Sequence, residues 1–336
     1  MSLTFILKRL ALAIPTLFGV AVIVFVLLRV VPGDPIAMMI GPGATEADIR
    51  NLRAIYGLDR SLFDQFLIYI GGLARGDFGI SISLRQDVME LILGRLPVTL
   101  ELCGVALAIA LVFGNSLGIA AAYGRDGWLE AAVDGITGFM LAIPDFLWAL
   151  LFILFVVLLD LSGLPISGQI DLDLGYRGAT SFYLIESLLR GELAAFGSVL
   201  LHALLPAAAL ALPLIAIIAR VLKNSLIETM TQDYVLLARV KGFSKFRILV
   251  RDALRNALVP TITLTGVQIT FLVGGTVLIE KIFSYPGIGN MAIDAVINRD
   301  LPLIQGLVLT FALLFLLVNL AIDLSYAVLN PRLRHG

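Results

Sequence analysis

The feature that most constrains this chain is its series of long segments without charge. Leu10 to Leu28 is an uncharged stretch of 19 residues, long enough to cross a hydrocarbon core of about 30 Å as a helix. Further apolar segments follow at about 98–123, 135–159, 199–221, 258–279 and 303–328. Lone strands would leave backbone groups unpaired in lipid. The sequence therefore predicts an all-α integral membrane protein with six transmembrane helices.

Composition agrees with this fold class. Of the 336 residues, 59% are hydrophobic and 15% are charged, whereas soluble domains have about 25% charged residues. The net charge of −1 provides no basic field for binding nucleic acid. A single cysteine, Cys103, and two histidines, His202 and His335, leave little for a metal or thiol site.

The first apolar segment, at about 10–30, has a second interpretation as a cleaved signal peptide. Its uncharged run is longer than a usual signal-peptide core of about 7–15 residues. No small-residue cleavage site follows, because the next residues are Val31-Pro32-Gly33-Asp34-Pro35. We therefore interpret the segment as the first span. Prolines 15, 144, 206, 213 and 260 lie in or near spans, and we interpret them as shaping helix packing, with moving hinges as the alternative.

The distribution of positive charge predicts the orientation of the chain. An even number of spans places both termini on one side. With the termini inside, the inner segments hold 13 Lys and Arg residues, whereas the short outer loops hold only four. Positive residues accumulate on the cytoplasmic side of membrane proteins. The sequence therefore predicts cytoplasmic termini.

The pattern of the first predicted outer segment, 31–97, indicates short helices that pack on the membrane domain. Thr45 and Asp48 resemble a capping box, and Gly57 can end the helix that they begin. A second short helix is expected over 61–70. This segment is either a structural lid over the helix bundle or a docking surface for an outside partner.

The predicted inner loop, 220–256, is more apolar than a solvated loop requires. Tyr234, Leu237, Ala238 and Lys241 have the spacing of one helix face. We expect a partner to cover this face, with packing on the chain's own bundle as the alternative. Gly242 then suits a left-handed turn and Ser244 a helix N-cap, so the pattern predicts helix, turn, helix.

The second helix of that loop is basic, with Lys245, Arg247, Arg251 and Arg255. We interpret these charges as retaining the loop inside and contacting anionic lipid headgroups. The chain has no Gly-x-x-x-x-Gly-Lys phosphate loop and no His-Glu-x-x-His motif. We therefore expect no enzyme activity in the chain itself, and any ATP hydrolysis must come from another subunit.

Several motifs together resemble a known family. Asp233–Gly242 and Ala253–Pro260, with Val31–Pro35, Gly76–Ser81, Ile282–Gly289 and Asn330–Arg332, resemble ABC-type permeases of the dipeptide/oligopeptide importer family. The loop departs from the broader importer motif, because Leu236 stands where that motif has Glu, and Leu237 where it has Ala. The resemblance implies a type I importer permease with one transmembrane permease domain, residues 1–336, in the bacterial inner membrane.

The resemblance also implies partners. The family's permeases pair with a second permease, usually a related one, and with two cytoplasmic ATPases that bind ATP and Mg. A periplasmic or lipid-anchored binding protein delivers the substrate, and lipids surround the spans. The chain itself would hold no cofactor. The implied ATPase-coupling residues are Tyr234, Leu237, Ala238, Lys241, Gly242 and Phe243.

Polar residues at membrane depth suggest where a substrate pathway runs. A carboxylate near the bilayer centre costs about 2.5–3.5 kcal/mol on insertion scales and needs a partner or a watery cavity. Glu101, Asp145 and Gln268 are the pathway candidates, with hydrogen bonds that stabilise the bundle as the alternative. An ion-driven secondary transporter using Asp145 or Glu101 is the rival function, although the chain shows no internal repeat. A scaffold without transport is a third interpretation.

Overall fold

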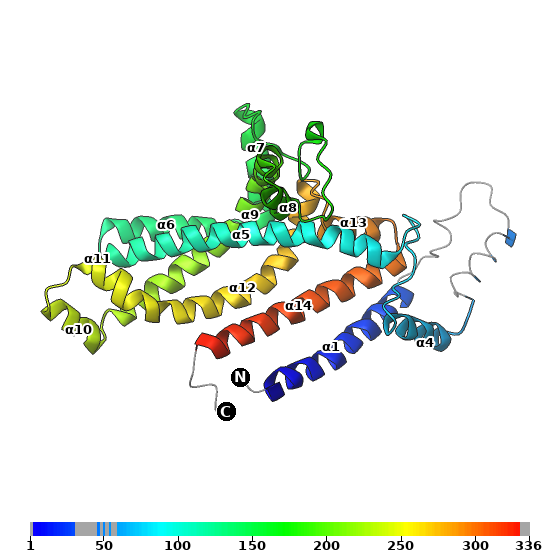
Figure 1. Cartoon of the computed structure of the whole chain (residues 1–336), viewed down its shortest axis with the longest axis horizontal. Helices are drawn as coiled ribbons and strands as arrows, with labels where there is room; N and C mark the ends of the chain where they lie inside the picture. The colour runs from blue at the N-terminus through cyan, green and yellow to red at the C-terminus, as the bar shows by residue number, and fades with distance from the viewer. Residues whose placement is uncertain (1–2, 31–45, 48–49, 51–53, 55–58, 330–336) are drawn as a thin grey trace. The chain divides into compact units, whose positions relative to one another are not determined.

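The computed structural model describes residues 3–30, 46–47, 50, 54 and 59–329, and these residues are almost entirely helical (Figure 1). In this part of the chain, the only β-pairing is a single bridge between Ile80 and Asp87. The long helices are α1 (Leu3–Val30), α5 (Val88–Tyr123), α9 (Leu193–Thr229), α12 (Leu254–Ile282) and α14 (Leu301–Leu329). The helix predicted at 45–57 lies largely outside the described residues.

Shorter helices connect these long ones. They are α4 (Leu62–Leu73), α6 (Trp128–Ala142), α7 (Asp145–Leu158), α8 (Tyr183–Arg190), α10 (Asp233–Val240), α11 (Lys245–Arg247) and α13 (Ile288–Ile297), with a 3₁₀ turn η1 (Leu172–Leu174) and a π-helical segment η2 (Ile248–Ala253). The short helix predicted over 61–70 is confirmed as α4. Its N-cap is Ser61, whose hydroxyl accepts a hydrogen bond from the Asp64 backbone N–H.

The membrane spans agree in number with the prediction. Among the described residues, five helical segments are long and apolar enough to cross a membrane, and α6 with α7 gives a sixth if the pair is one broken span. The helices extend past the predicted limits: α5 begins at Val88 rather than near 98, and α9 runs from Leu193 to Thr229 rather than 199–221. The predicted limits are too short because hydropathy detects only the apolar part of each helix and not its polar ends.

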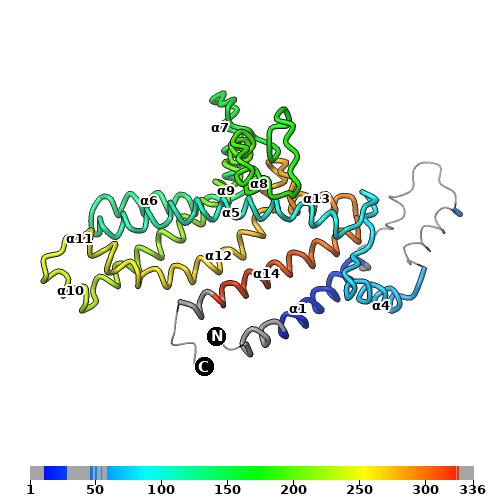
Figure 2. The backbone as a smooth tube through the Cα atoms, in the orientation of Figure 1, coloured from blue at the N-terminus to red at the C-terminus, as the bar shows by residue number. Residues whose placement is uncertain are grey.

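The structure corrects the prediction of the third span. Residues 135–159 do not form one helix, because α6 and α7 meet at a bend of 98° (Figure 2). Pro144 lacks an N–H and disfavours helical geometry in the preceding residue. Ile143 is accordingly extended, with φ −108° and ψ 124°. Prolines 15, 206, 213 and 260 instead lie inside continuous helices.

The chain divides into two compact units, Met1–Pro97 with Gly287–Leu317, and Val98–Pro286 with Val318–Gly336. In the first unit, α1 packs on α4 through Phe25, whose ring centroid lies 5.2 Å from that of Phe66 and 5.7 Å from that of Tyr69. Buried Asp300 accepts hydrogen bonds from the Ser81 and Ser83 hydroxyls and caps α14 at the Leu303 N–H. The single permease domain proposed for the whole chain stays a prediction.

In the second unit, α9 is the central helix and contacts α6, α7, α8 and α12. It also packs closely against α5, where Ala110 lies in a buried cluster with Ala211, Leu214, Ile215 and Ile218. Gly114 and Gly118 of α5 allow this approach. Small residues four positions apart commonly let membrane helices pack closely.

Candidate functional site

The predicted inner loop folds as the sequence pattern indicates. Helix α10 ends at Val240, and Gly242 takes the left-handed conformation with φ +77°. The Gly242 N–H donates to the Arg239 carbonyl at 2.9 Å, which closes the turn. Ser244 then caps α11, because its hydroxyl accepts a hydrogen bond from the Arg247 N–H. The predicted sequence of helix, turn and helix is confirmed.

One side of α10 packs on its own chain. Val235 and Ala238 form a buried cluster with Ile248 of η2, and Met230 packs against it. Ala238 is only 8% exposed. For Ala238 the structure therefore favours the alternative of packing on the chain's own helices, whereas Tyr234 and Leu237 are exposed.

The opposite side of α10 is exposed and apolar. Leu237 is 55% exposed and Val240 78%, and Leu236 is exposed as well. We call these three residues the exposed α10 face. Lys241, Gly242 and Phe243 follow at its edge and are also exposed. Helix α10 therefore leaves leucine and valine side chains exposed on one side, although its other side already packs on the chain's own residues.

Two contacts fix the loop to other helices. The Lys245 ammonium donates to the Tyr123 carbonyl at the end of α5 at 2.5 Å and lies 5.2 Å from the centre of the Tyr123 ring. The Phe246 ring packs edge-on against the same ring. Leu249 and Ala253 of η2 are buried in a cluster with Leu222 and Leu226 of α9, and Ala122 and Ala257 complete it. The loop is thus held by α5, α9 and α12.

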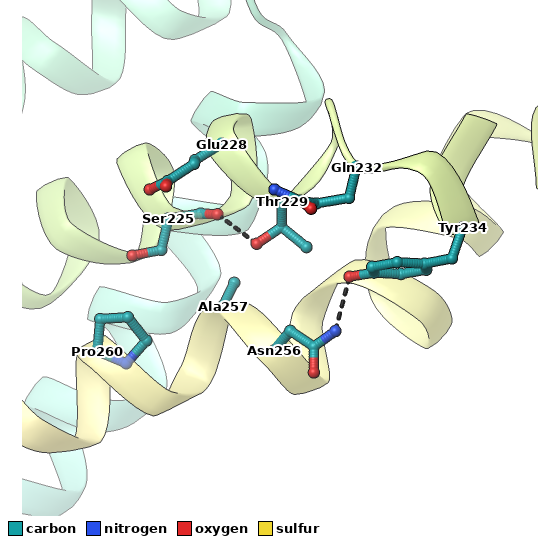
Figure 3. Close-up of a pocket in the computed structure, with 8 residues that line it drawn as sticks. All are labelled: Ser225, Glu228, Thr229, Gln232, Tyr234, Asn256, Ala257 and Pro260. Atoms are coloured by element: carbon teal, nitrogen blue, oxygen red, sulfur yellow. Dashed lines mark hydrogen bonds between the residues drawn. The ribbon is translucent and has the colours of Figure 1, made fainter.

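A cavity of about 280 Å³ lies between the end of α9, the start of α10 and α12 (Figure 3). Its lining is mostly polar: Ser225, Glu228, Thr229, Gln232, Tyr234, Asn256, Ala257 and Pro260. The Asn256 side-chain amide donates to the Tyr234 hydroxyl at 2.7 Å across this cavity. Tyr234, predicted to contact a partner, thus directs its hydroxyl toward its own chain.

The pathway candidates occupy three separate environments. Glu101 is 7% exposed, and its Oε1 accepts a hydrogen bond from the Ile185 N–H at 3.1 Å. Asp145 is the first residue of α7, and Gln268 is half-buried on α12. Within the described residues, no hydrogen bond or ion pair joins any two of the three. Their roles in a pathway stay a prediction.

Sequence reasoning missed buried polar groups near Glu101. Glu280 is fully buried on α12 and accepts a hydrogen bond from the Thr99 hydroxyl at 2.6 Å. The predicted span ended at 279, which placed Glu280 outside it. Tyr285 follows α12, and burial raises the pKa of its hydroxyl, with Glu101 and Glu280 adding to the effect.

Sequence reasoning also missed an ion cluster that joins α9 to α6. The Lys223 ammonium lies 2.7 Å and 2.8 Å from the two Asp134 oxygens and 3.2 Å from Glu130 Oε1. In the sequence, Lys223 was recognised only as one of the positive charges of the segments predicted to lie inside. The spacing of Glu130 and Asp134, four residues apart, was the available signal, because such residues share a helix face.

Helix α8, which precedes α9, contains a carboxylate, Glu186, that accepts several hydrogen bonds. Glu186 accepts hydrogen bonds from the Thr180 and Ala179 N–H groups at 2.9 Å and 2.7 Å. These bonds lower the pKa of the carboxyl below its ordinary value. Arg190 forms an ion pair with the same carboxylate. Glu186 therefore orders the loop that leads into α8.

The arrangement defines a class: a multi-pass helical membrane protein whose loop 220–256 is anchored to its helices. A chain of the MetNI methionine ABC transporter, solved in inward-facing conformations, has the same fold. The TM-score is 0.54 at 18% sequence identity, and the match covers 72% of this chain and 97% of that chain. This likeness shows the fold alone.

The family is shown by sequence comparison. Residues 114–335 match the model described as binding-protein-dependent transport system inner membrane component, and residues 2–103 match the model of its N-terminal part. The chain belongs to this family, and it is therefore a multi-pass permease of the inner membrane. The predicted resemblance is confirmed.

Two curated relatives extend over nearly the whole chain. The di/tripeptide transport system permease protein DppB of Pseudomonas aeruginosa is 39% identical over 335 residues, 99% of each chain. The dipeptide transport system permease protein DppB of Escherichia coli K12 is 37% identical over 338 residues, again 99% of each. These matches support an ABC importer permease and not the ion-driven secondary transporter.

Proposed function

We propose that this chain forms half of a translocation pathway for di- and oligopeptides and couples it to cytoplasmic ATPases through the loop 220–256. The exposed α10 face is the observation that carries this proposal. Leaving apolar side chains in water is unfavourable by about 25 cal/mol for each Å² that a partner could cover. A partner that packs on Leu236, Leu237 and Val240 removes that surface from water.

The anchoring of the loop explains how docking transmits motion. Val235 and Ala238 hold α10 against η2, and Lys245 ties the following helix to the end of α5. A force on the exposed α10 face is thus passed to helices of the membrane domain instead of bending a free loop. Rigid movement of packed helices is a known way to switch a transporter.

The remaining parts of the transporter belong to other chains in this proposal. Two cytoplasmic ATPases hold ATP and Mg, since the sequence has no phosphate loop, and this chain is a non-catalytic subunit. A second, related permease completes the pathway, and a periplasmic or lipid-anchored binding protein supplies the peptide. Both termini lie in the cytoplasm. The names of the two relatives support a peptide substrate.

Docking is tested by co-purification of the ATPases with the permease in mild detergent. Leu237→Asp places a charge in the exposed α10 face, and we expect the ATPases to be lost while the permease stays in the membrane. Leu189→Asp is the matched control, because Leu189 is 82% exposed on α8, on the predicted outer side. Full retention of the ATPases by the Leu237 variant would overturn the docking proposal.

Substrate and energy source are tested in proteoliposomes that contain the whole complex. We expect uptake of a labelled dipeptide to require ATP and the binding protein, and unlabelled di- and tripeptides to compete. Uptake driven by a proton gradient without ATP would instead support the ion-driven rival. ATP-dependent uptake that excess peptide leaves unchanged would overturn the peptide assignment only.

A further inference from the structure

Lys223, which pairs with Glu130 and Asp134 of α6, lies in the first part of the segment 220–256, where α9 has not yet ended. Lys223 is six residues before the end of α9 at Thr229, or about 9 Å along the helix axis. Helix α10 begins at Asp233. The residue is therefore on the helix that enters the coupling loop, in its last turns.

The ammonium contacts α6 at two points. Asp134 gives both carboxylate oxygens at 2.7 Å and 2.8 Å, and Glu130 gives Oε1 at 3.2 Å. Glu130 is itself fixed, because its Oε2 accepts a hydrogen bond from the Asp126 N–H at 2.7 Å. Since Glu130 and Asp134 are one turn apart, the ammonium holds that turn of α6 against sliding and rotation.

The surroundings make this contact sensitive to change. Lys223 is 9% exposed, and a buried charge that loses its partner is strongly destabilising. The rest of the contact between α6 and α9 includes Met140 of α6, which packs against a buried apolar cluster that contains Leu214 and Ile218 of α9. Apolar packing has no preferred direction, so it resists separation of the helices better than it resists sliding. The ion cluster supplies the directional part of the contact.

We propose that Lys223, with Glu130 and Asp134, is a positioning residue that passes movement of the coupling loop from α9 into α6. Movement of α6 then reaches α7 through the bend at Pro144. The inference rests on the proposed coupling function. Without the cluster, ATPases still dock on the exposed α10 face and hydrolyse ATP. Less peptide is then transported for each ATP hydrolysed, because the movement of α9 is passed less completely to α6.

The test is the ratio of transported peptide to hydrolysed ATP in proteoliposomes with the whole complex. For Lys223→Met we expect unchanged co-purification of the ATPases, and a ratio about five-fold or more below that of the wild type, the lower end of usual coupling strengths. Arg220→Met is the matched control. Arg220 is an exposed cation of the same helix, and in the described structure it forms no ion pair.

A charge exchange separates coupling from simple stability. Lys223→Glu combined with Asp134→Lys keeps one cation between two carboxylates, and we expect it to restore the ratio to at least about half of the wild-type value. If Lys223→Met does not accumulate in the membrane, the inference is tested by the transport ratio of Asp134→Asn and of the exchanged pair instead. A wild-type ratio in Lys223→Met or Asp134→Asn would overturn the inference. So would a folded exchanged pair that stays uncoupled.

These outcomes are distinct from failure of the proposed function. If the wild-type complex neither retains the ATPases nor transports peptide on ATP, the coupling function is wrong, and the inference falls with it. If the wild type does both and Lys223→Met keeps the normal ratio, only the role of the cluster is wrong.

Discussion

Replacing Gly118 by alanine tests the close contact between α5 and α9 in the second unit. A Cβ at this position would lie 2.9 Å from the Ala219 carbonyl oxygen and 3.0 Å from Leu222 Cβ of α9. Ordinary contacts of this kind are 3.4–4 Å. The helices must therefore separate by about half an ångström, because backbone and Cβ atoms cannot rotate away.

The change in the free energy of unfolding caused by Gly118→Ala is the sum of two opposed effects. Overpacking a tight interface costs about 1–3 kcal/mol, whereas alanine favours a helix over glycine by about 1 kcal/mol. Gly104→Ala is the matched control, because Gly104 lies on α5 too and a Cβ there has nothing of this chain within 4 Å. The propensity gain is common to both variants. The Gly118 variant should thus be less stable than the Gly104 variant by about 1–3 kcal/mol.

The assay is equilibrium unfolding of the purified chain by SDS in mixed micelles, followed by far-ultraviolet circular dichroism. Gly114→Ala should behave like Gly118→Ala, since its Cβ would lie 2.8 Å from Ile218 Cβ. A Gly118 variant as stable as the Gly104 variant would refute the reasoning. It would mean that α5 and α9 do not approach each other as closely as the glycine positions indicate.

Three further predictions address other parts of the chain. Gly242→Val should reduce ATP-driven transport more than Gly242→Asn at equal membrane levels, because asparagine tolerates φ +77° better; uptake assays with immunoblotting compare them. Asp300→Asn should destabilise the first unit by about 1–3 kcal/mol, since one acceptor oxygen cannot serve its four hydrogen bonds; unfolding in SDS measures this. The lowered pKa of Glu186 means that its stabilisation of the loop is complete above the ordinary glutamate pKa and is lost as pH falls through the lowered value. Proteolysis of the loop should therefore accelerate in acid, and Glu186→Gln should remove that acid dependence.

Hydropathy and local turn chemistry were sufficient to predict five of the spans and the turn of the loop 220–256. Long uncharged segments leave few alternatives to a membrane helix. Likewise, Gly242 and Ser244 act through their own backbone and side chain, so their positions in the sequence predicted the turn and the N-cap that the structure contains. Such features depend on residues within a few positions of one another.

Contacts between distant residues could not be predicted in the same way. The helical spacing of Tyr234, Leu237 and Ala238 identified an amphipathic helix but not which side faces its own chain. That choice depends on Ile248, which packs against Val235 and Ala238 only after the turn has formed. The pairing of Lys223 with Asp134 joins residues 89 positions apart, and no local pattern specifies such a partner.

The bend at Pro144 changes what Asp145 implies about a pathway. An average of hydropathy along the sequence does not show where a helix axis changes direction. It therefore placed Asp145 inside a continuous span, where a carboxylate costs about 2.5–3.5 kcal/mol. In the structure, Asp145 begins α7, and its Oδ1 accepts a hydrogen bond from the Phe146 N–H at 2.7 Å. A helix N-terminus stabilises a carboxylate by about 0.3–2 kcal/mol, so part of the cost is offset locally. The charge of Asp145 therefore does not by itself require an aqueous pathway. Glu101 keeps the stronger claim, because its Oε2 is buried without a hydrogen-bond partner among the described residues.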